Sequence, residues 1–112
     1  MLYLIGIIFI ALGILFKFLP PQKINSIYGY RTKLSMKNQD TWNEAQRYSA
    51  YSFLIFGLIY LIAGLVFHLF LQNIDMIYQI LVFLTGIFIM IIFDEGHLRK
   101  MYNKDGSKID IK

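Results

Sequence analysis

Three long apolar runs constrain the fold of this chain more than any other feature of its sequence. They cover roughly residues 2–19, 48–71 and 76–93. A helix rises about 1.5 Å per residue, so each run is long enough to cross a bilayer. The apolar share of the chain is 57%, well above that of a soluble domain. The sequence therefore predicts an all-α membrane protein in which residues 1–112 form one domain with three transmembrane helices.

Prolines and polar residues mark the ends of the expected helices. Pro20 and Pro21 end the first helix, because neither can donate a helical hydrogen bond. No basic segment precedes this run, so we expect a retained helix rather than a cleaved signal peptide. The segment Thr41-Trp42-Asn43-Glu44 matches a capping box. We therefore expect a second helix to start at Thr41 and to run without a break to about Leu71.

Two of the helices are expected to project beyond the bilayer. The second helix should be about 45 Å long, whereas the hydrocarbon core is about 30 Å thick. Its first two turns should therefore stand at or above the interface. The third helix should continue for a turn or two after Phe93, into the tail of residues 94–112. A turn is expected at Asn103-Lys104-Asp105-Gly106, followed by a short or frayed end.

The positions of the basic residues predict the orientation of the chain. All eleven lysines and arginines lie in two segments, residues 17–47 and 99–112. With three spans, both segments fall on the same side of the membrane, and the positive-inside rule makes that side cytoplasmic. We therefore expect a multi-pass cell-membrane protein with its N-terminus outside and its C-terminus inside. The net charge of +4 then faces anionic lipid rather than nucleic acid.

The loop between the first two runs, residues 20–47, carries more functional groups than a linker needs. Gly29 permits backbone angles that a Cβ would forbid, so we expect a sharp turn there. Tyr28, Tyr30 and Trp42 could wall an ordered pocket, or they could form an aromatic belt at the lipid headgroups. We favour an ordered loop, because a belt does not need a glycine between two tyrosines. The candidate binding residues are Asn25, Tyr28, Gly29, Tyr30, Arg31, Thr32, Ser35 and Trp42.

Arg31 is the strongest single candidate in this loop. Its guanidinium offers five donors in a rigid fork that suits a carboxylate or a phosphate. One role for it is to bind an external anion, such as a lipid phosphate or a peptide carboxylate. The other is to pair with Asp94 or Glu95 of the tail and so to tie the loop to the third helix. Both roles stay open from the sequence.

Several motifs of the loop and tail carry a resemblance to a known family. They are Pro20-Pro21-x-Lys23-Ile24-Asn25, Tyr28-Gly29-Tyr30-Arg31-Thr32-x-x-Ser35, Trp42 with Ala45-Gln46, Glu95-x-x-Leu98 and Asn103-x-Asp105-Gly106. In these motifs, and along nearly its whole length, the chain resembles the SdpI/YfhL family of small bacterial membrane proteins. The resemblance implies an immunity protein that protects a cell from a secreted, membrane-active peptide toxin of the SdpC kind.

Two other functions are compatible with the same residues. The basic loop would attract an acidic cytosolic regulator, as in a signalling module. A pocket beside Arg31 would instead bind a lipid or a small molecule. The sequence holds no nucleophile–base–acid set, Walker loop or dinucleotide fingerprint, so we expect no enzyme and no cofactor. The expected partners are the bilayer and a peptide toxin or cytosolic regulator, without nucleic acid; a homodimer stays open.

Small and ionisable residues in the runs give two further expectations. Gly6 and Gly13 are seven residues apart, as are the members of the series Ala50, Gly57 and Gly64, and such spacing lets helices approach closely. His68 and Asp75 should form a polar rim rather than a proton-linked pair. Without cysteine the chain has no disulfide or thiolate metal site. Asp94 and His97 alone are too few ligands, so we expect no metal.

Overall fold

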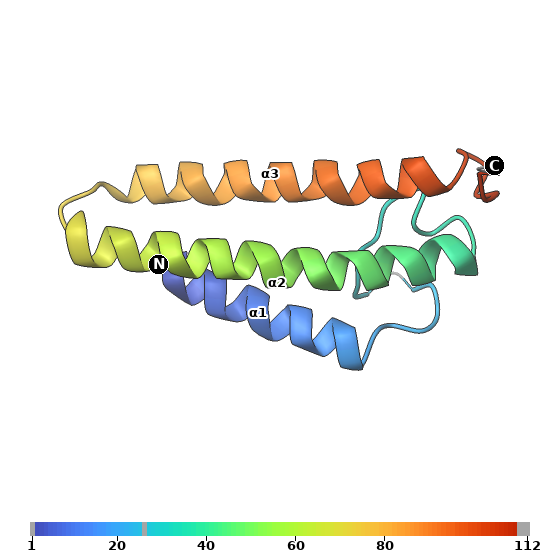
Figure 1. Cartoon of the computed structure of the whole chain (residues 1–112), viewed down its shortest axis with the longest axis horizontal. Coiled ribbons are helices and arrows are strands. Elements are labelled where there is room, and N and C mark those ends of the chain that lie inside the picture. Colours follow the sequence, from blue (N-terminus) through green and yellow to red (C-terminus); the bar gives the residue numbers. More distant parts are fainter. Residues whose placement is uncertain (1, 26, 110–112) are drawn as a thin grey trace.

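The computed structural model describes residues 2–25 and 27–109, and their fold is all-α, as predicted. Helix α1 spans Leu2–Phe18, α2 spans Gln39–Phe70 and α3 spans Met76–Met101. Figure 1 shows α2 along the middle of the molecule, with α1 on one side of it and α3 on the other. The long loop and the C-terminal end meet at the same end of the bundle. Helices α2 and α3 are long and apolar enough to cross a membrane, and α1 is a shorter apolar helix.

The apolar surface of the helices marks the chain as a membrane protein. Leu84 is 54% exposed, Phe88 is 67% exposed and Ile92 is 53% exposed, all on α3. A soluble helix of this composition would bury such side chains, because contact of apolar surface with water is costly. In a bilayer the lipid tails cover them instead. The molecule is 51 Å long, whereas a hydrocarbon core is about 30 Å thick.

Helices α1 and α2 pack closely along a seam of small residues. A Cβ added at Gly6 would lie 2.6 Å from the carbonyl oxygen of Gly57, and a Cβ at Gly57 would lie 2.8 Å from the amide nitrogen of Ile10. Further along the same seam, a Cβ added at Gly13 of α1 would lie 2.9 Å from the carbonyl oxygen of Ala50 on α2. The two backbones therefore come into contact, which confirms the packing predicted from the heptad spacing.

All three helices meet around one buried tyrosine. Tyr60 of α2 is 1% exposed, and its hydroxyl donates a 2.7 Å hydrogen bond to the carbonyl oxygen of Phe83 on α3. Gly86 makes room for the phenol, since a Cβ there would lie 2.7 Å from the Tyr60 Cζ. Phe9 of α1 completes the cluster, with ring centroids 5.4 Å from Tyr60 and 6.4 Å from Phe83. This cluster is the apolar core of the bundle.

The start of α2 differs from the sequence prediction. The helix begins at Gln39, and Asn38 is its N-cap. The Thr41 amide donates to Asn38 Oδ1 at 2.9 Å, and the Asn38 amide donates to Thr41 Oγ1 at 3.1 Å. The predicted box from Thr41 to Glu44 is therefore wrong, because the short Asn38 side chain caps the helix three residues earlier. Thr41 is the third residue of the helix, and Asn38 is the N-cap.

The other helix boundaries agree with the prediction. α2 continues without a break to Phe70, and Leu71 is its C-cap. α3 extends two turns past Phe93 to Met101. The turn that follows contains Gly106, whose φ of +88° favours glycine.

The glycine seam gives a stability prediction with a matched control. Gly57→Ala should destabilise the bundle by about 1–3 kcal/mol, because the new methyl group would overlap the backbone of α1. Gly96→Ala is the control, since a Cβ at Gly96 meets nothing within 4 Å. It should be neutral or stabilising, because alanine is the better helix former. Unfolding in detergent by circular dichroism measures both; equal effects would contradict close packing at Gly57.

Candidate functional site

The loop of residues 19–38 runs between the N-terminal turns of α2 and the C-terminal turns of α3. Figure 1 shows it next to both helices at the end of the bundle where the chain terminates. Hydrogen bonds join it to Trp42 and Gln46 of α2 and to Glu95 of α3. The loop, α2 and α3 therefore form one hydrogen-bonded assembly.

A buried glutamine on α2 holds the centre of the loop. Gln46 is 1% exposed. Its Oε1 accepts a 2.7 Å hydrogen bond from the Tyr30 amide, and its Nε2 donates a 2.8 Å bond to the Tyr30 carbonyl oxygen. The preceding Gly29 has a φ of +107°, which confirms the predicted turn, and a Cβ there would lie 2.7 Å from Gln46 Oε1. Gln46 therefore fixes both the position and the direction of Tyr30.

Trp42 lies one helical turn before Gln46, on the same face of α2. It is fully buried, and its Nε1 donates a 2.6 Å hydrogen bond to the Pro21 carbonyl oxygen. The alternative of a headgroup belt, which the sequence did not favour, does not hold for Trp42, because its ring is buried and a loop carbonyl accepts from its only side-chain donor. Tyr28 is instead 46% exposed, and its ring centroid lies 6.2 Å from that of Phe16 on α1. The two aromatic residues do not share a pocket.

Hydrogen bonds within the loop order the segments on both sides of Gly29. Asn25 Oδ1 accepts from the amides of Ile27 and Tyr28, each at 2.9 Å. Ser35 is fully buried, and its Oγ accepts from the Thr32 amide at 2.7 Å. Such side-chain bonds to nearby amides are typical of fixed turns. Asn25 and Ser35 thus shape the loop, and their polar groups face the chain itself.

Glu95 joins the loop to α3. Its Oε1 accepts hydrogen bonds from the Thr32 hydroxyl at 2.5 Å and from the Tyr30 hydroxyl at 3.0 Å. Burial and the Glu95 carboxylate raise the pKa of the Tyr30 phenol above its ordinary value, so the phenol stays a donor. The loop is therefore linked to Glu95 through the two residues that flank Arg31, whereas the contact that the sequence predicted had Arg31 itself as its donor. Whether Arg31 binds an external anion or pairs with an acid of the tail stays open, and both roles remain predictions.

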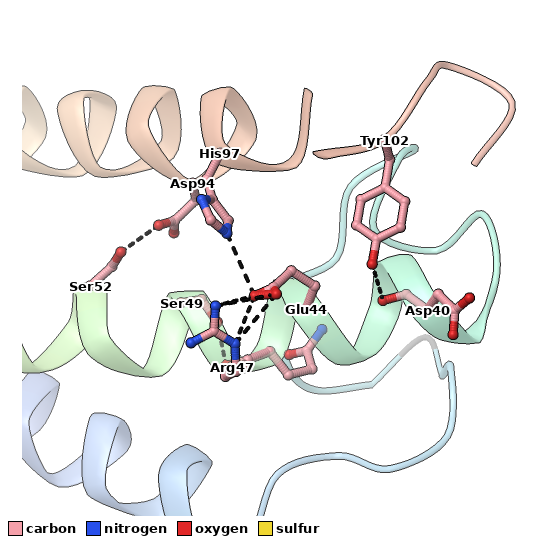
Figure 2. A network of polar contacts seen from close by, with 9 residues as sticks. Asp40, Glu44, Arg47, Ser49, Ser52, Asp94, His97 and Tyr102 are labelled. Atoms are coloured by element: carbon pink, nitrogen blue, oxygen red, sulfur yellow. Dashed lines mark hydrogen bonds and ion pairs between the residues drawn. The ribbon is translucent and has the colours of Figure 1, made fainter. Parts of the chain in front are cut away.

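A polar network that the sequence analysis missed lies between α2 and α3 (Figure 2). Asp94 is 2% exposed and accepts a short hydrogen bond from the Ser52 hydroxyl. One turn further along α3, the His97 ring stacks on Tyr48, with centroids 3.9 Å apart. His97 Nε2 lies 3.5 Å from Glu44 Oε1, at ion-pair distance without a hydrogen bond. The spacing of four between residues 44, 48 and 52 was the signal that could have revealed this polar stripe.

The tail packs on the start of α2. Tyr102 is 8% exposed, and its hydroxyl donates a 3.3 Å hydrogen bond to the Asp40 carbonyl oxygen (Figure 2). Asn38 Nδ2 donates a 2.8 Å bond to the Gly106 carbonyl oxygen, so the N-cap of α2 also holds the predicted turn. The chain then returns, and the Ile109 amide donates to the Met101 carbonyl oxygen at 2.8 Å. Ile109 is thus held against the end of α3, and the end that was expected to be short or frayed, residues 110–112, lies outside the described residues.

Two cavities flank this assembly. One, of about 680 Å³, is lined by four basic residues and by Glu95. The other, of about 530 Å³, lies between the end of α1, the loop and the first turns of α2. Within residues 2–25 and 27–109, no group of three or more histidine, aspartate or glutamate side chains is arranged to hold a metal ion. This end of the molecule thus presents hydrogen-bonding groups and basic side chains.

The two bonds from Gln46 predict a local effect. Gln46→Leu should destabilise the loop by about 1–3 kcal/mol, because the part-buried Tyr30 amide would lose its acceptor. Hydrogen exchange at the Tyr30 amide should become much faster, and the helices should remain. Gln72→Leu, an exposed change in the turn after α2, is the matched control. Unchanged protection of Tyr30 in the Gln46 variant would contradict this role.

Comparison with known proteins places the chain in a family. The model of the SdpI/YfhL protein family matches residues 22–93. The chain is 42% identical over 101 residues to the protein named "Uncharacterized protein YfhL" of Bacillus subtilis (strain 168), which covers 90% of this chain and 87% of that protein. No solved structure matches. The matched region includes residues 22–38 of the loop and the whole of α2, and the chain belongs to the SdpI/YfhL family.

Proposed function

We propose that this chain is a three-span membrane protein that protects its cell from a secreted, membrane-active peptide toxin of the SdpC kind. The observation that carries the proposal is its membership in the SdpI/YfhL family, since the motifs of that likeness form one ordered assembly here. No catalytic role is assigned to any residue. The protein acts through binding or through a change of conformation.

The proposed topology has the motif loop and the tail in the cytoplasm and the N-terminus outside. It is supported by the eleven basic residues, which all lie in the loop, in the helix turns beside it and in the tail. Helix α1 is the shortest span, at about 25 Å for 17 residues. Lys17 at its end can extend to the headgroups and so adapt the helix to the bilayer.

This topology requires a route from the toxin to the loop, because a secreted peptide arrives at the opposite side. Helix α3 provides one, since its apolar surface faces the lipid and its last turns hold Glu95. A peptide that binds α3 within the bilayer would shift the helix against α2. Such a shift would break the bonds from Thr32 and Tyr30 to Glu95 and thereby release the loop.

Survival of a toxin-sensitive bacterial strain tests this proposal. Cells that express the parent chain should survive, and Thr32→Val should abolish protection. The change removes the hydroxyl that donates to Glu95, a bond worth about 1.5–3 kcal/mol, and that accepts from the Ser35 amide. Arg31→Ala should also lose protection if Arg31 serves the same assembly. Thr85→Val, an exposed position on α3, makes the same chemical change away from the loop and should protect fully.

Membrane levels of each variant must equal those of the parent for the comparison to count. Failure of the parent to protect against any of several SdpC-like peptides would overturn the immunity proposal. Protection by all three variants would keep immunity and remove the loop from its mechanism.

A second function, capture of an acidic cytosolic regulator, is favoured by the cavity of about 680 Å³. Lys33, Lys37, Arg99 and Lys104 line it, and Glu95, the acid beside them, already binds two hydroxyls. Such a concentration of positive charge attracts acidic surfaces. The double variant Lys33→Gln/Lys37→Gln should lose a co-purifying regulator that Lys23→Gln retains. If no specific acidic protein co-purifies with the parent chain, that result would count against this function.

A further inference from the structure

The cavity of about 530 Å³ is separate from the contacts between the loop and α3. It opens where the last turn of α1 meets the first turns of α2. Phe16 and Ala50 form an apolar floor, since they are 8% and 2% exposed. Lys17, Asn43, Arg47 and several amide side chains line it as well. The cavity thus combines an apolar base with a basic and amide-rich rim.

Positive charge dominates this rim. Lys17 and Arg47 line the cavity, and no carboxylate among the described residues does. Lys17 Nζ lies 5.5 Å from the centroid of the Tyr51 ring, a cation–π contact that holds the ammonium group over the cavity wall. Arg47 donates to Glu44 through Nε and Nη2, and its Nη1 takes no part in that pair. Two cations therefore face a cavity that contains no described acid.

Neutral donors complement the two cations. Asn43 Oδ1 accepts a 2.7 Å hydrogen bond from Gln39 Nε2. The Asn43 side-chain nitrogen takes no part in that hydrogen bond. Gln39 also donates to the Gln22 carbonyl oxygen at 2.5 Å, which fixes the loop as the third wall. The lining of this cavity thus offers an ammonium group, a guanidinium group and an amide to an oxyanion. Phosphate is the oxyanion that such donor sets commonly bind.

The apolar floor points to a lipid as the source of the phosphate. Lys17 ends an apolar helix, at the depth where lysine reaches the headgroups. Basic pockets between membrane helices on the cytoplasmic side are typical sites for anionic headgroups. We infer that this cavity binds the phosphate of an anionic phospholipid, with the glycerol and upper methylenes on Phe16 and Ala50. The inference does not depend on toxin immunity, and a bound lipid would fasten the end of α1 to α2.

Native mass spectrometry of the full chain, released from detergent micelles, tests this site. The parent should retain phosphatidylglycerol more strongly than phosphatidylcholine, which has no net negative charge. Lys17→Gln should weaken phosphatidylglycerol binding about fivefold, the effect expected for one cation at a membrane surface. Asn43→Asp is nearly isosteric, keeps the acceptor for Gln39 and adds a negative charge to the rim, so it should weaken binding at least as much.

Two controls distinguish the cavity from general surface charge. Lys100→Gln removes the same charge from an exposed position on α3 and should bind as the parent does. Lys17→Arg should keep most of the binding, which separates charge from misfolding. Helical content by circular dichroism should be equal in all variants.

Three results would overturn the inference. The first is equal retention of the two lipids by the parent. The second is the same loss in Lys100→Gln as in Lys17→Gln, which would indicate diffuse attraction. The third is displacement of the lipid by inorganic phosphate at an equal concentration, which would assign the cavity to free phosphate. None of these results bears on toxin survival, so the two proposals fail independently.

Discussion

The two hydrogen bonds between Gln46 and the backbone of Tyr30 are the constraint on which the rest of the loop depends. A buried amide that pairs with both the N–H and the C=O of one residue fixes that residue in position and direction. With Tyr30 fixed, Thr32 and the Tyr30 phenol can reach the same oxygen of Glu95. The close approach explains Gly29 as well, since a Cβ would collide with the Gln46 side chain. One side chain of α2 thus organises a contact between the loop and α3.

The two sides of α2 are held by different physical means. On the α1 side, glycines bring backbones together, and the contact depends on dispersion over many atoms. On the α3 side, a polar network separates the tyrosine cluster from the loop, and it is only partly satisfied. Asp94 Oδ2 is buried without a hydrogen-bond partner among the described residues. A partly satisfied polar network stabilises less than close apolar packing, so α3 is the helix with more freedom to shift.

Features set by local pattern could be predicted from the sequence. The apolar runs gave the all-α class and helix boundaries near Phe70 and Met101, because length and hydropathy determine them. The heptad glycines gave the contact between α1 and α2 for the same reason. The start of α2 was wrong by two residues, since Asn38 and Thr41 both match an N-cap and only the folded chain decides between them.

Features set by contacts distant in sequence could not be predicted. For Trp42 the sequence left a pocket wall and a headgroup belt open, because its hydrogen-bond partner is a proline carbonyl 21 residues away. Gln46 was visible only as part of a motif, because its partner is a backbone group of the loop. The Glu95 contact spans 63 residues to Thr32, and it turns a membrane helix into a support for the loop. A displacement of α3 would therefore act directly on the loop at that end of the bundle, as the proposed route from the toxin to the loop requires.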